Sequence, residues 1–217
     1  MTGAFVVSPG RPVRKLADVQ PTIRPYRPAD LDAVYDICVR TADAGGDARG
    51  HYSDDRLVGD VFAANYVTLE PEHAHVVDDG AGNAVGYVLG TADTEGFVRR
   101  CRDEWLPVVA GRYDGADPRD QGLIWLLHQP ERMLAPELAD YPAHLHIDLL
   151  PEIQGRGLGR ALMSTFLAGL HAAGVARVHL SMSPSNTAAR AFYDRLGFVE
   201  IAVPGARSVT SLGRDTA

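Results

Sequence analysis

The sequence predicts an α/β protein in which a central sheet of about six to seven strands is flanked by helices. Short apolar runs of strand type alternate along the chain with segments whose apolar residues recur at helical spacing. One predicted strand, residues 144–150, is followed by a glycine-rich loop and an amphipathic helix over 158–173. The chain has 217 residues, 46% hydrophobic and 23% charged, so it is long enough for one sizeable domain or a domain with an insertion.

The beginning of the chain differs in composition from the rest. Residues 1–20 mix glycine, proline and basic residues without periodicity. Such a segment lacks the apolar pattern of a packed core, so we expect a flexible N-terminal arm. The folded domain is expected to occupy residues 21–217, with no internal repeat and no low-complexity tract.

Elements in the first half follow from proline positions and from side-chain periodicity. Pro28 suits the first turn of a helix, and Leu31, Val34, Tyr35 and Cys38 follow at helical spacing. The tetrapeptide GAGN separates two apolar runs and is typical of a hairpin turn. The sequence therefore predicts, in order, a strand over 22–26, a helix over 28–42, a helix over 53–69 and paired strands over 73–79 and 84–92.

Residues 93–143 interrupt this pattern with mixed helical pieces. A segment of this length between two strands exceeds an ordinary connection, so we expect a helical insertion in the domain. After the insertion the sequence predicts a strand over 144–150, a helix over 158–173, a strand over 177–182, a helix over 186–197 and strands over 198–203 and 208–214.

The strand over 144–150 has two different faces, because successive side chains of a strand point to opposite sides. His144, His146 and Asp148 lie on one face, and leucine and isoleucine residues lie on the other. We expect the apolar face to pack on the core and the polar face to look outward. Pro151 cannot donate to a sheet ladder, so pairing is expected to stop there and the neighbouring strand to splay away.

The stretch QGRGLG, residues 154–159, joins this strand to the next helix. Glycines let backbone N–H groups converge, and the free N–H groups and the dipole at a helix N-terminus attract anions. Arg156 and Arg160 add positive charge at the same place. The loop therefore predicts a ligand that carries phosphates.

Glycine spacing separates this loop from two common phosphate-binding motifs. In the dinucleotide fingerprint GxGxxG the third glycine would fall on Arg160, so the fingerprint fails. The nucleotide triphosphate loop GxxxxGK[ST] is absent from the chain. The motif that remains is QxxGxG, Gln154 to Gly159, after a strand. The alternative to a phosphate-binding loop is a glycine-rich turn that only joins the strand to the helix.

Two motifs together carry a resemblance to a known family. QGRGLG and NTAARAFYDRLGF (186–198) resemble the GNAT superfamily of acetyl-CoA-dependent N-acetyltransferases. In addition, IRPYRPADLDAVYDIC (23–38) and GYVLGTADTEGFVRRCRDEWLP (86–107) are similar to the acetyltransferase-like domain at the C-terminus of eukaryotic O-GlcNAcase and to its free-standing bacterial relatives. The resemblance implies a GNAT fold, with a mixed central sheet splayed at the acetyl-CoA site. The eukaryotic domain has lost the glycine loop, whereas this chain keeps it, which favours retained cofactor binding.

The resemblance implies acetyl-CoA as cosubstrate. Its pyrophosphate would lie on the N–H groups of the glycine loop, and its pantetheine arm in the wedge between strands 144–150 and 177–182. The residues expected to bind it are Leu149, Leu150, Gln154, Gly155, Arg156, Gly157, Leu158, Gly159, Arg160, Asn186 and Tyr193.

The resemblance also implies catalytic roles. Tyr193 matches the family tyrosine that donates to the CoA sulfur, and the N–H of Leu149 is expected to stabilise the oxyanion. A lysine-like amine, with a pKa near ~10.4, must lose a proton before it attacks, for which Asp148 is the first candidate and His146 the second. The alternatives are a core aromatic residue for Tyr193 and a hydrogen-bonded polar face for the other two.

The expected function is therefore an N-acetyltransferase that moves an acetyl group to a primary amine by direct attack in a ternary complex. The alternative is a noncatalytic acyl-CoA-binding or protein-interaction domain. The insertion is expected to form one wall of the acceptor pocket, and its ten acidic residues against six arginines would suit a cationic amine. Trp105, Tyr113 and Trp125 would either line that pocket or pack the insertion onto the domain.

Charge and cysteine content limit the other partners. A formal net charge of -7 disfavours nucleic acid and anionic membranes, so acetyl-CoA and an amine acceptor are the expected partners and a homodimer is left open. Two separated cysteines, Cys38 and Cys101, without a secretory signal or an apolar run of about 20 residues, predict a cytoplasmic protein. His144, His146 and Asp148, or the pair His73 and His75, could meet at a metal, but neither set is a clear ligand pattern, so no metal is expected.

Overall fold

The computed structural model describes residues 20–113, 115–206 and 208–217. The predicted arm over 1–20 lies outside these residues apart from Gln20. In the described part of the chain seven strands form one sheet with the order β1-β2-β3-β4-β5-β7-β6. The strands are β1 (Thr22–Pro25), β2 (His75–Asp78), β3 (Ala84–Thr91), β4 (Ala143–Leu149), β5 (Arg177–Met182), β6 (Val199–Ile201) and β7 (Thr210–Asp215).

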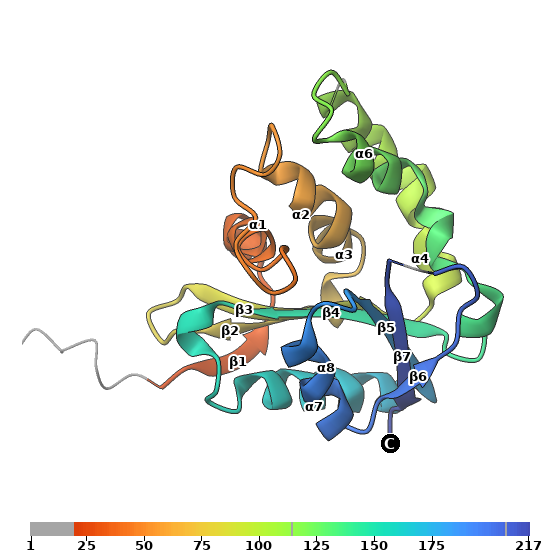
Figure 1. Cartoon of the computed structure of the whole chain (residues 1–217). Helices are drawn as coiled ribbons and strands as arrows, with labels where there is room; N and C mark the ends of the chain where they lie inside the picture. The colour runs from red at the N-terminus through yellow and green to blue at the C-terminus, as the bar shows by residue number, and fades with distance from the viewer. Residues whose placement is uncertain (1–19, 114, 207) are drawn as a thin grey trace, which may run out of the picture.

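The sheet is mixed. Every neighbouring pair is antiparallel except β4 and β5, which run parallel. In Figure 1 the strands β5, β6 and β7 are steeply inclined to the layer formed by β1 to β4. The α/β class with a mixed, helix-flanked sheet is therefore confirmed.

Helices cover both faces of the sheet. Figure 1 shows α7 and α8 below the sheet, and α1 to α4 with α6 above it. Within the described residues, none of the helices combines the length and the apolar character required to cross a bilayer. The helices are α1 (Leu31–Val39), α2 (Arg56–Phe62), α3 (Ala64–Leu69), α4 (Thr94–Arg100), α5 (Leu106–Val109), α6 (Gln121–His128), α7 (Leu158–Ala172) and α8 (Thr187–Arg195).

The core lies between β3, β4 and the helices on either side. Leu162, Phe166 and Leu170 form the apolar face of the amphipathic helix predicted over 158–173, and all three are buried. On β3, Tyr87 and Leu89 are completely buried. Since burying one such apolar side chain contributes about 1.5–3 kcal/mol, the three side chains of α7 hold that helix firmly against the sheet, while Tyr87 and Leu89 belong to the opposite face of β3.

One predicted helix is divided in two. The helix predicted over 53–69 is found as α2 and α3, with a break at Ala63, whose φ of -140° is not helical. Close to the break, the Asn65 side chain accepts a hydrogen bond from the backbone N–H of Tyr66 at 3.1 Å. Asparagine side chains that bond to the backbone in this way compete with helical hydrogen bonds.

The sheet opens between β4 and β5. These two strands are paired only where Ala143 faces Val178 and His144 faces His179. The splay predicted at Pro151 is therefore present, but it begins several residues earlier than the proline. From residue 145 to 149, the edge of β4 that faces β5 has no strand partner among the described residues.

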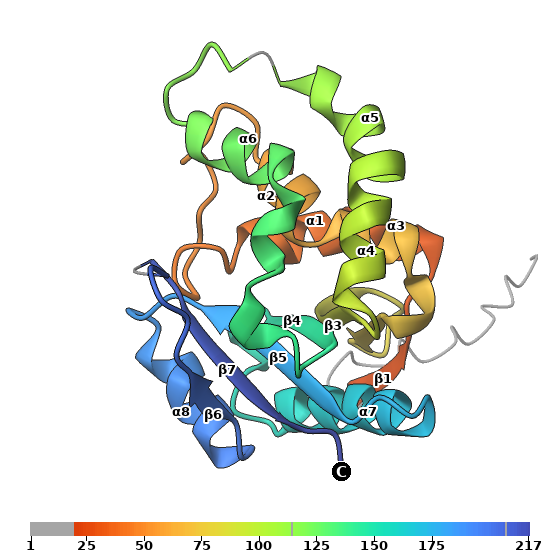
Figure 2. The ribbon, with the colours of Figure 1, turned by 90° about the vertical axis from the view of Figure 1, so that its right-hand side faces the viewer.

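The insertion between β3 and β4 rises above the sheet, where α4, a π-helix (Cys101–Trp105), α5 and α6 stack beside α2 (Figure 2). A buried carboxylate on α2 is one of the groups that tie it to the rest of the molecule. Asp60 of α2 is 0% exposed and accepts hydrogen bonds from Tyr35 of α1, from Tyr113 at 2.7 Å and from Arg112 at 2.9 Å. Trp105 adds a bond from Nε1 to the backbone oxygen of Asp60 at 2.9 Å. The packing role is thereby confirmed for Trp105 and Tyr113, whereas Trp125 is 60% exposed.

Candidate active site

A cavity of about 310 Å³ lies where β4 separates from β5. Four segments line it: the loop after α1, the end of β4, the glycine loop and α8. Its lining residues are Thr41, Ala44, Gly45, Ile147, Asp148, Leu149, Gln154, Gly155, Gly159, Asn186, Ala188, Ala189, Phe192 and Tyr193. Seven of the residues singled out from the sequence are among them: Asp148, Leu149, Gln154, Gly155, Gly159, Asn186 and Tyr193.

The end of β4 offers a free backbone donor to this cavity. The N–H of Leu150 donates to the oxygen of Val85 on the β3 side at 3.1 Å. Because backbone groups of adjacent residues in a strand point to opposite edges, the N–H of Leu149 points toward the opened side. The oxygen of Leu149 accepts a bond from Nε2 of Gln154 at 2.8 Å, so the Gln154 side chain fixes the strand end. Leu150 itself is buried and does not line the cavity.

The glycine loop presents bare backbone at the start of α7. Gly155 and Gly157 have φ values of +73° and +79°, in the left-handed region that favours glycine. A Cβ atom at Gly157 would find no heavy atom within 4 Å, whereas at Gly159 it would touch the Phe192 ring at 3.4 Å. The space above Gly157 is therefore open to a ligand, and Gly159 packs α7 against α8. Arg156, Gly157, Leu158 and Arg160 do not line the cavity but continue the loop into α7.

Helix α8 begins and ends as predicted. The side chain of Asn186 accepts the N–H of Ala189 at 2.9 Å, which caps the helix. Gly197, with a φ of +78°, follows its last turn in the left-handed conformation. The helix therefore holds Tyr193 in a fixed position on the cavity wall.

Tyr193 is only 8% exposed, and its ring packs on Phe192 and Phe198. Its hydroxyl has no hydrogen-bond partner anywhere in the described chain, although the residue lines the cavity. Burial raises the pKa of Tyr193 well above its usual value, and the nearby Asp148 charge raises it further. The hydroxyl therefore keeps its proton at neutral pH and is available as a donor.

Asp148 lines the same cavity from β4. Its Oδ2 accepts a hydrogen bond from the hydroxyl of Tyr87 on β3 at 2.7 Å. Burial raises the pKa of Asp148 to about 6, although the Tyr87 hydrogen bond works in the opposite direction. A carboxylate with this pKa is ionised at neutral pH and accepts a proton more readily than an exposed aspartate.

His144 and His146 lie deeper on the same face of β4. The expectation that this face looks outward is wrong for His144, which is 4% exposed because α3 and α4 cover it. Thr94 donates to the oxygen of Pro142, so its hydroxyl accepts from Nδ1 of His144, and Nε2 then accepts from Tyr66, both at 2.7 Å. This imidazole is held in one tautomer.

His146 contacts the aromatic rings of Phe62 and Tyr66 and does not line the cavity. Burial, together with the Arg132 charge, lowers the pKa of His146 to about 4. Over the described ranges, no group of three or more histidine, cysteine or acidic side chains is arranged to hold a metal ion.

The insertion contributes less to the site than the sequence suggested. No described residue between 93 and 143 lines the cavity. Its acidic side chains are mostly paired with arginines, as in Glu95 with Arg99 at 2.7 Å and Glu104 with Arg100 at 2.9 Å. The acidic composition therefore reflects a solvated, ion-paired surface and lends no support to a cationic acceptor.

Two features of the site carried only a weak signal in the sequence. The segment with Thr41, Ala44 and Gly45 is rich in glycine and aspartate, a composition that indicates a loop but does not predict that it closes the cavity beside Asn186. A Cβ atom at Gly45 would lie 3.1 Å from the Asn186 side-chain nitrogen. The sequence places Tyr87 in a predicted strand but does not predict its contact with Asp148. That contact depends on the register of β3 and β4.

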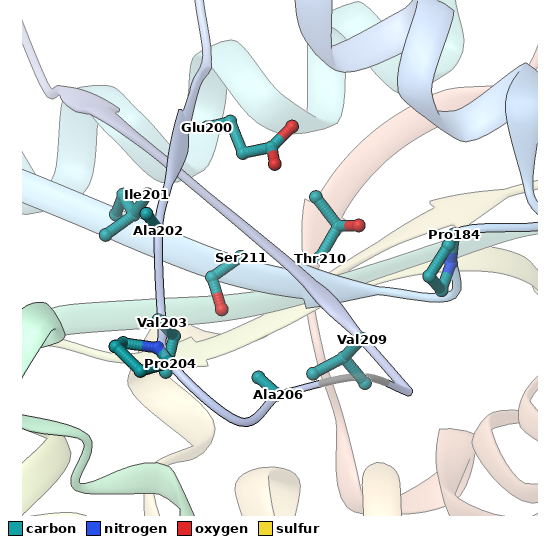
Figure 3. Close-up of a pocket in the computed structure, with 10 residues that line it drawn as sticks. All are labelled: Pro184, Glu200, Ile201, Ala202, Val203, Pro204, Ala206, Val209, Thr210 and Ser211. Atoms are coloured by element: carbon teal, nitrogen blue, oxygen red, sulfur yellow. The ribbon is translucent and has the colours of Figure 1, made fainter.

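A second hollow of about 340 Å³ lies beside β6 and β7 (Figure 3). Its walls come from Pro184 after β5, from β6 with Glu200 and Ile201, and from β7 with Thr210 and Ser211. The Glu200 carboxylate is paired with Arg190 at 2.7 Å. Since Pro184 lines this hollow and Asn186 lines the first cavity, both open near the same end of β5.

Comparison with known proteins adds a family match. The sequence profile described as the acetyltransferase (GNAT) family matches residues 43–198. Protein O-GlcNAcase of Rattus norvegicus is 29% identical over 187 residues, which cover 83% of this chain and 20% of that protein. The chain thus spans about a fifth of the length of this relative.

Solved structures of similar fold include two informative cases. The crystal structure of SsHAT is 66% identical, with a TM-score of 0.86 and coverage of 91% of this chain and 98% of that one. A GNAT superfamily phosphinothricin acetyltransferase from Sinorhizobium meliloti, solved in complex with acetyl-CoA, is 15% identical, with a TM-score of 0.54 and coverage of 90% and 88%. At that identity the second likeness concerns the fold alone.

Proposed function

The chain belongs to the acetyltransferase (GNAT) family, and from this premise we propose that it transfers an acetyl group from acetyl-CoA to a primary amine by direct attack in a ternary complex. The resemblance predicted from its two motifs is thereby confirmed. Membership makes the chain an acyltransferase of the N-acetyltransferase type, with acetyl-CoA as cosubstrate.

One observation carries the proposal: a single cavity brings together Asp148, the N–H of Leu149 and Tyr193 beside the glycine loop. A proton acceptor, an oxyanion donor and a proton donor are the groups that acyl transfer to an amine requires. They come from β4 and α8, which both line the cavity.

The residues around the cavity fit acetyl-CoA in their chemistry. The open space over Gly157 and the free N–H groups at the start of α7 suit the pyrophosphate. The unpaired edge of β4 suits the amide-bearing pantetheine arm, because an extended chain with amides pairs with a free strand edge. Beside the residues that line the cavity, the loop residues Arg156, Leu158 and Arg160 complete the proposed phosphate site.

In the proposed reaction the amine gives up its proton to Asp148, and its nitrogen then forms a bond to the acetyl carbonyl carbon. The N–H of Leu149 stabilises the negative oxygen that develops. As the carbon–sulfur bond breaks, Tyr193 gives its proton to the sulfur, and the second proton that the nitrogen loses on becoming an amide returns Tyr193 to its neutral form. Asp148 is preferred to His146 as the base because Asp148 lines the cavity and His146 does not.

Three further expectations stay predictions. Cys38 and Cys101 are buried and unpaired, which supports a reducing location such as the cytoplasm. A homodimer also stays a prediction. The noncatalytic alternative, a domain that binds acyl-CoA or a protein without chemistry, is decided by the rate measurements below.

Initial rates of thiol release test the proposal. The protein is given acetyl-CoA and a panel of primary amines, including lysine peptides, amino sugars and polyamines, and both substrates are varied. Direct attack in a ternary complex predicts intersecting double-reciprocal lines and an N-acetylated product identified by mass spectrometry. Parallel lines would contradict direct attack, and the absence of product with every amine, despite saturable acetyl-CoA binding, would favour the noncatalytic alternative.

A further inference from the structure

Two arginines beside the glycine loop lack the partners that most arginines of the chain have. Most described arginines lie within 4.0 Å of a carboxylate, as Arg24 does with Asp30 at 2.6 Å. By contrast, the side chains of Arg160 on α7 and Arg195 on α8 have no ion pair and no hydrogen bond within the described residues. Such cations are free to bind an anion from outside.

These two arginines line the same cavity, which has a volume of about 450 Å³ and also includes Arg214 of β7 and Asp215. The Arg214 guanidinium is held by backbone oxygens, among them those of Leu196 and Ala217. The Asp215 carboxylate is bonded by Arg177 at 3.2 Å. Three guanidinium groups therefore line the cavity, and the one side-chain carboxylate among its lining residues is already paired.

This basic cavity adjoins the proposed acetyl-CoA cavity. Gly159 and Phe192 both line the acetyl-CoA cavity and lie against each other. Arg160 follows Gly159 directly, and Arg195 lies three residues beyond Phe192, which is about one helical turn. The two cavities are therefore lined by neighbouring residues of α7 and of α8.

The chemistry of CoA matches this order of sites. Its diphosphate connects the pantetheine arm to a ribose that carries a phosphomonoester at the 3′ position. With the arm along β4 and the diphosphate on the glycine loop, the next charged group is this phosphomonoester. A phosphomonoester bears about -1.5 to -2 charges at neutral pH, and arginine binds it through two parallel hydrogen bonds.

We infer that Arg160, Arg195 and Arg214 form a binding site for the 3′-phosphate of CoA, through which the protein distinguishes CoA from 3′-dephospho-CoA. The inference rests on the proposed acetyl-CoA site. Arg214, already fixed by backbone oxygens, supplies a positioned charge, and Arg160 and Arg195 close on the phosphate from the two helices.

Calorimetric titration with CoA and with 3′-dephospho-CoA tests the inference. The unchanged protein is expected to bind CoA at least about tenfold more tightly, since charge-assisted hydrogen bonds to the phosphate are lost with the other ligand. Arg195→Gln is expected to weaken CoA binding about tenfold while leaving 3′-dephospho-CoA binding unchanged. Arg195→Lys keeps the charge without the paired geometry and should retain part of the preference.

Arg99→Gln is the matched control, because Arg99 is exposed on α4 and far in sequence from the site, and it should keep the full preference. Circular dichroism and thermal melting confirm that each variant is folded. Equal affinity of the unchanged protein for the two ligands, or an equal loss for both in Arg195→Gln, would overturn the inference and leave the acetyl-CoA site intact. If the folded, unchanged protein binds neither ligand, the proposed function itself fails.

Discussion

At the residue scale, Asp148 and Tyr193 line one cavity but differ in protonation state at neutral pH. Burial raises the pKa of Asp148 to about 6 and also raises the pKa of Tyr193. At neutral pH the first side chain is thus mostly ionised and the second keeps its proton. When the environments in one site separate the pKa values of two titratable groups in this way, the ionised group is suited to act as the base and the protonated group as the acid.

Tyr193→Phe tests the acid. The substitution removes one hydroxyl without a hydrogen-bond partner in the described chain, so the packing on Phe192 and Phe198 is kept. We expect kcat to fall about 10²-fold, the usual contribution of a positioned acid, with the acetyl-CoA affinity nearly unchanged. Rates are measured by thiol release and affinity by calorimetry. A normal kcat would remove Tyr193 from the acid role.

Asp148 sets the acid limb of the rate profile. Because the base must be ionised, kcat/KM should reach its plateau about one pH unit above the pKa of Asp148, which is about 6, and should decrease as the pH falls through that value. In Tyr87→Phe the hydrogen bond to the carboxylate is lost, and that bond lowers the pKa of Asp148. The limb should therefore move about one unit higher in pH, given about 1.5–3 kcal/mol for a hydrogen bond to a charged group. The measurement is kcat/KM against pH.

Asp148→Asn provides the control for that profile. With no titrating carboxylate at this position, the limb near pH 6 should disappear and kcat should be about 10²-fold lower. A limb that persists in Asp148→Asn would assign the titration to another group, and a limb that stays in place in Tyr87→Phe would deny the hydrogen bond its role.

Local sequence predicted both of these residues, but not their surroundings. Strand alternation placed Asp148 on the polar face of β4, and a motif placed Tyr193 on α8. The partner Tyr87 lies 61 residues from Asp148 along the chain. Its contact arises only from the antiparallel register of β3 and β4, which no local pattern specifies.

At the element scale, the site depends on how α7 and α8 begin. Residues with special roles mark both starts, Gly157 for α7 and Asn186 for α8. These signals are local, so both helices could be predicted from the sequence within a few residues. The break between α2 and α3 could not be predicted, because neither a glycine nor a proline stands at Ala63 or next to it.

Asn186→Ala tests the start of α8. Loss of the cap should lower the free energy of unfolding by about 1 kcal/mol, measured by denaturant titration. Because α8 carries Phe192 and Tyr193 on the cavity wall, the acetyl-CoA affinity should fall as well. Asn186→Asp retains a capping oxygen and should restore the stability. Equal destabilisation by both substitutions would contradict the capping role.

At the scale of the whole molecule, a few long-range polar contacts attach the insertion to the domain. Asp60 accepts bonds from residues 25, 52 and 53 positions away along the chain. The sequence predicted an insertion of helical pieces, yet it could not predict how these pieces attach, because the attachment depends on side chains far apart in sequence. For the same reason, the early opening of β4 from β5 had no sequence signal beyond Pro151.

Asp60→Ala should destabilise the whole fold. It leaves Arg112 and two tyrosine hydroxyls without their buried acceptor, for which the expected cost is about 3 kcal/mol or more, measured by denaturant titration. Asp117→Ala removes a surface carboxylate paired with Arg119 and should leave stability almost unchanged. If the two variants unfold at the same denaturant concentration, Asp60 does not anchor the insertion.

The central claim is that acetyl-CoA lies on the glycine loop at the opening of the sheet. Gly157 and Gly174 both have a φ of +79° and no heavy atom within 4 Å of a Cβ position, and they flank α7 at opposite ends. An alanine at either site therefore carries the same backbone strain of about 1–2 kcal/mol, but only an alanine at Gly157 would meet the phosphates.

The decisive measurement is calorimetric titration of acetyl-CoA into the unchanged protein, Gly157→Ala and Gly174→Ala. The account predicts saturable binding that is at least about tenfold weaker in Gly157→Ala alone, since a methyl group there blocks the phosphate approach. Equal affinity in all three folded proteins, or no binding by the unchanged protein, would contradict it.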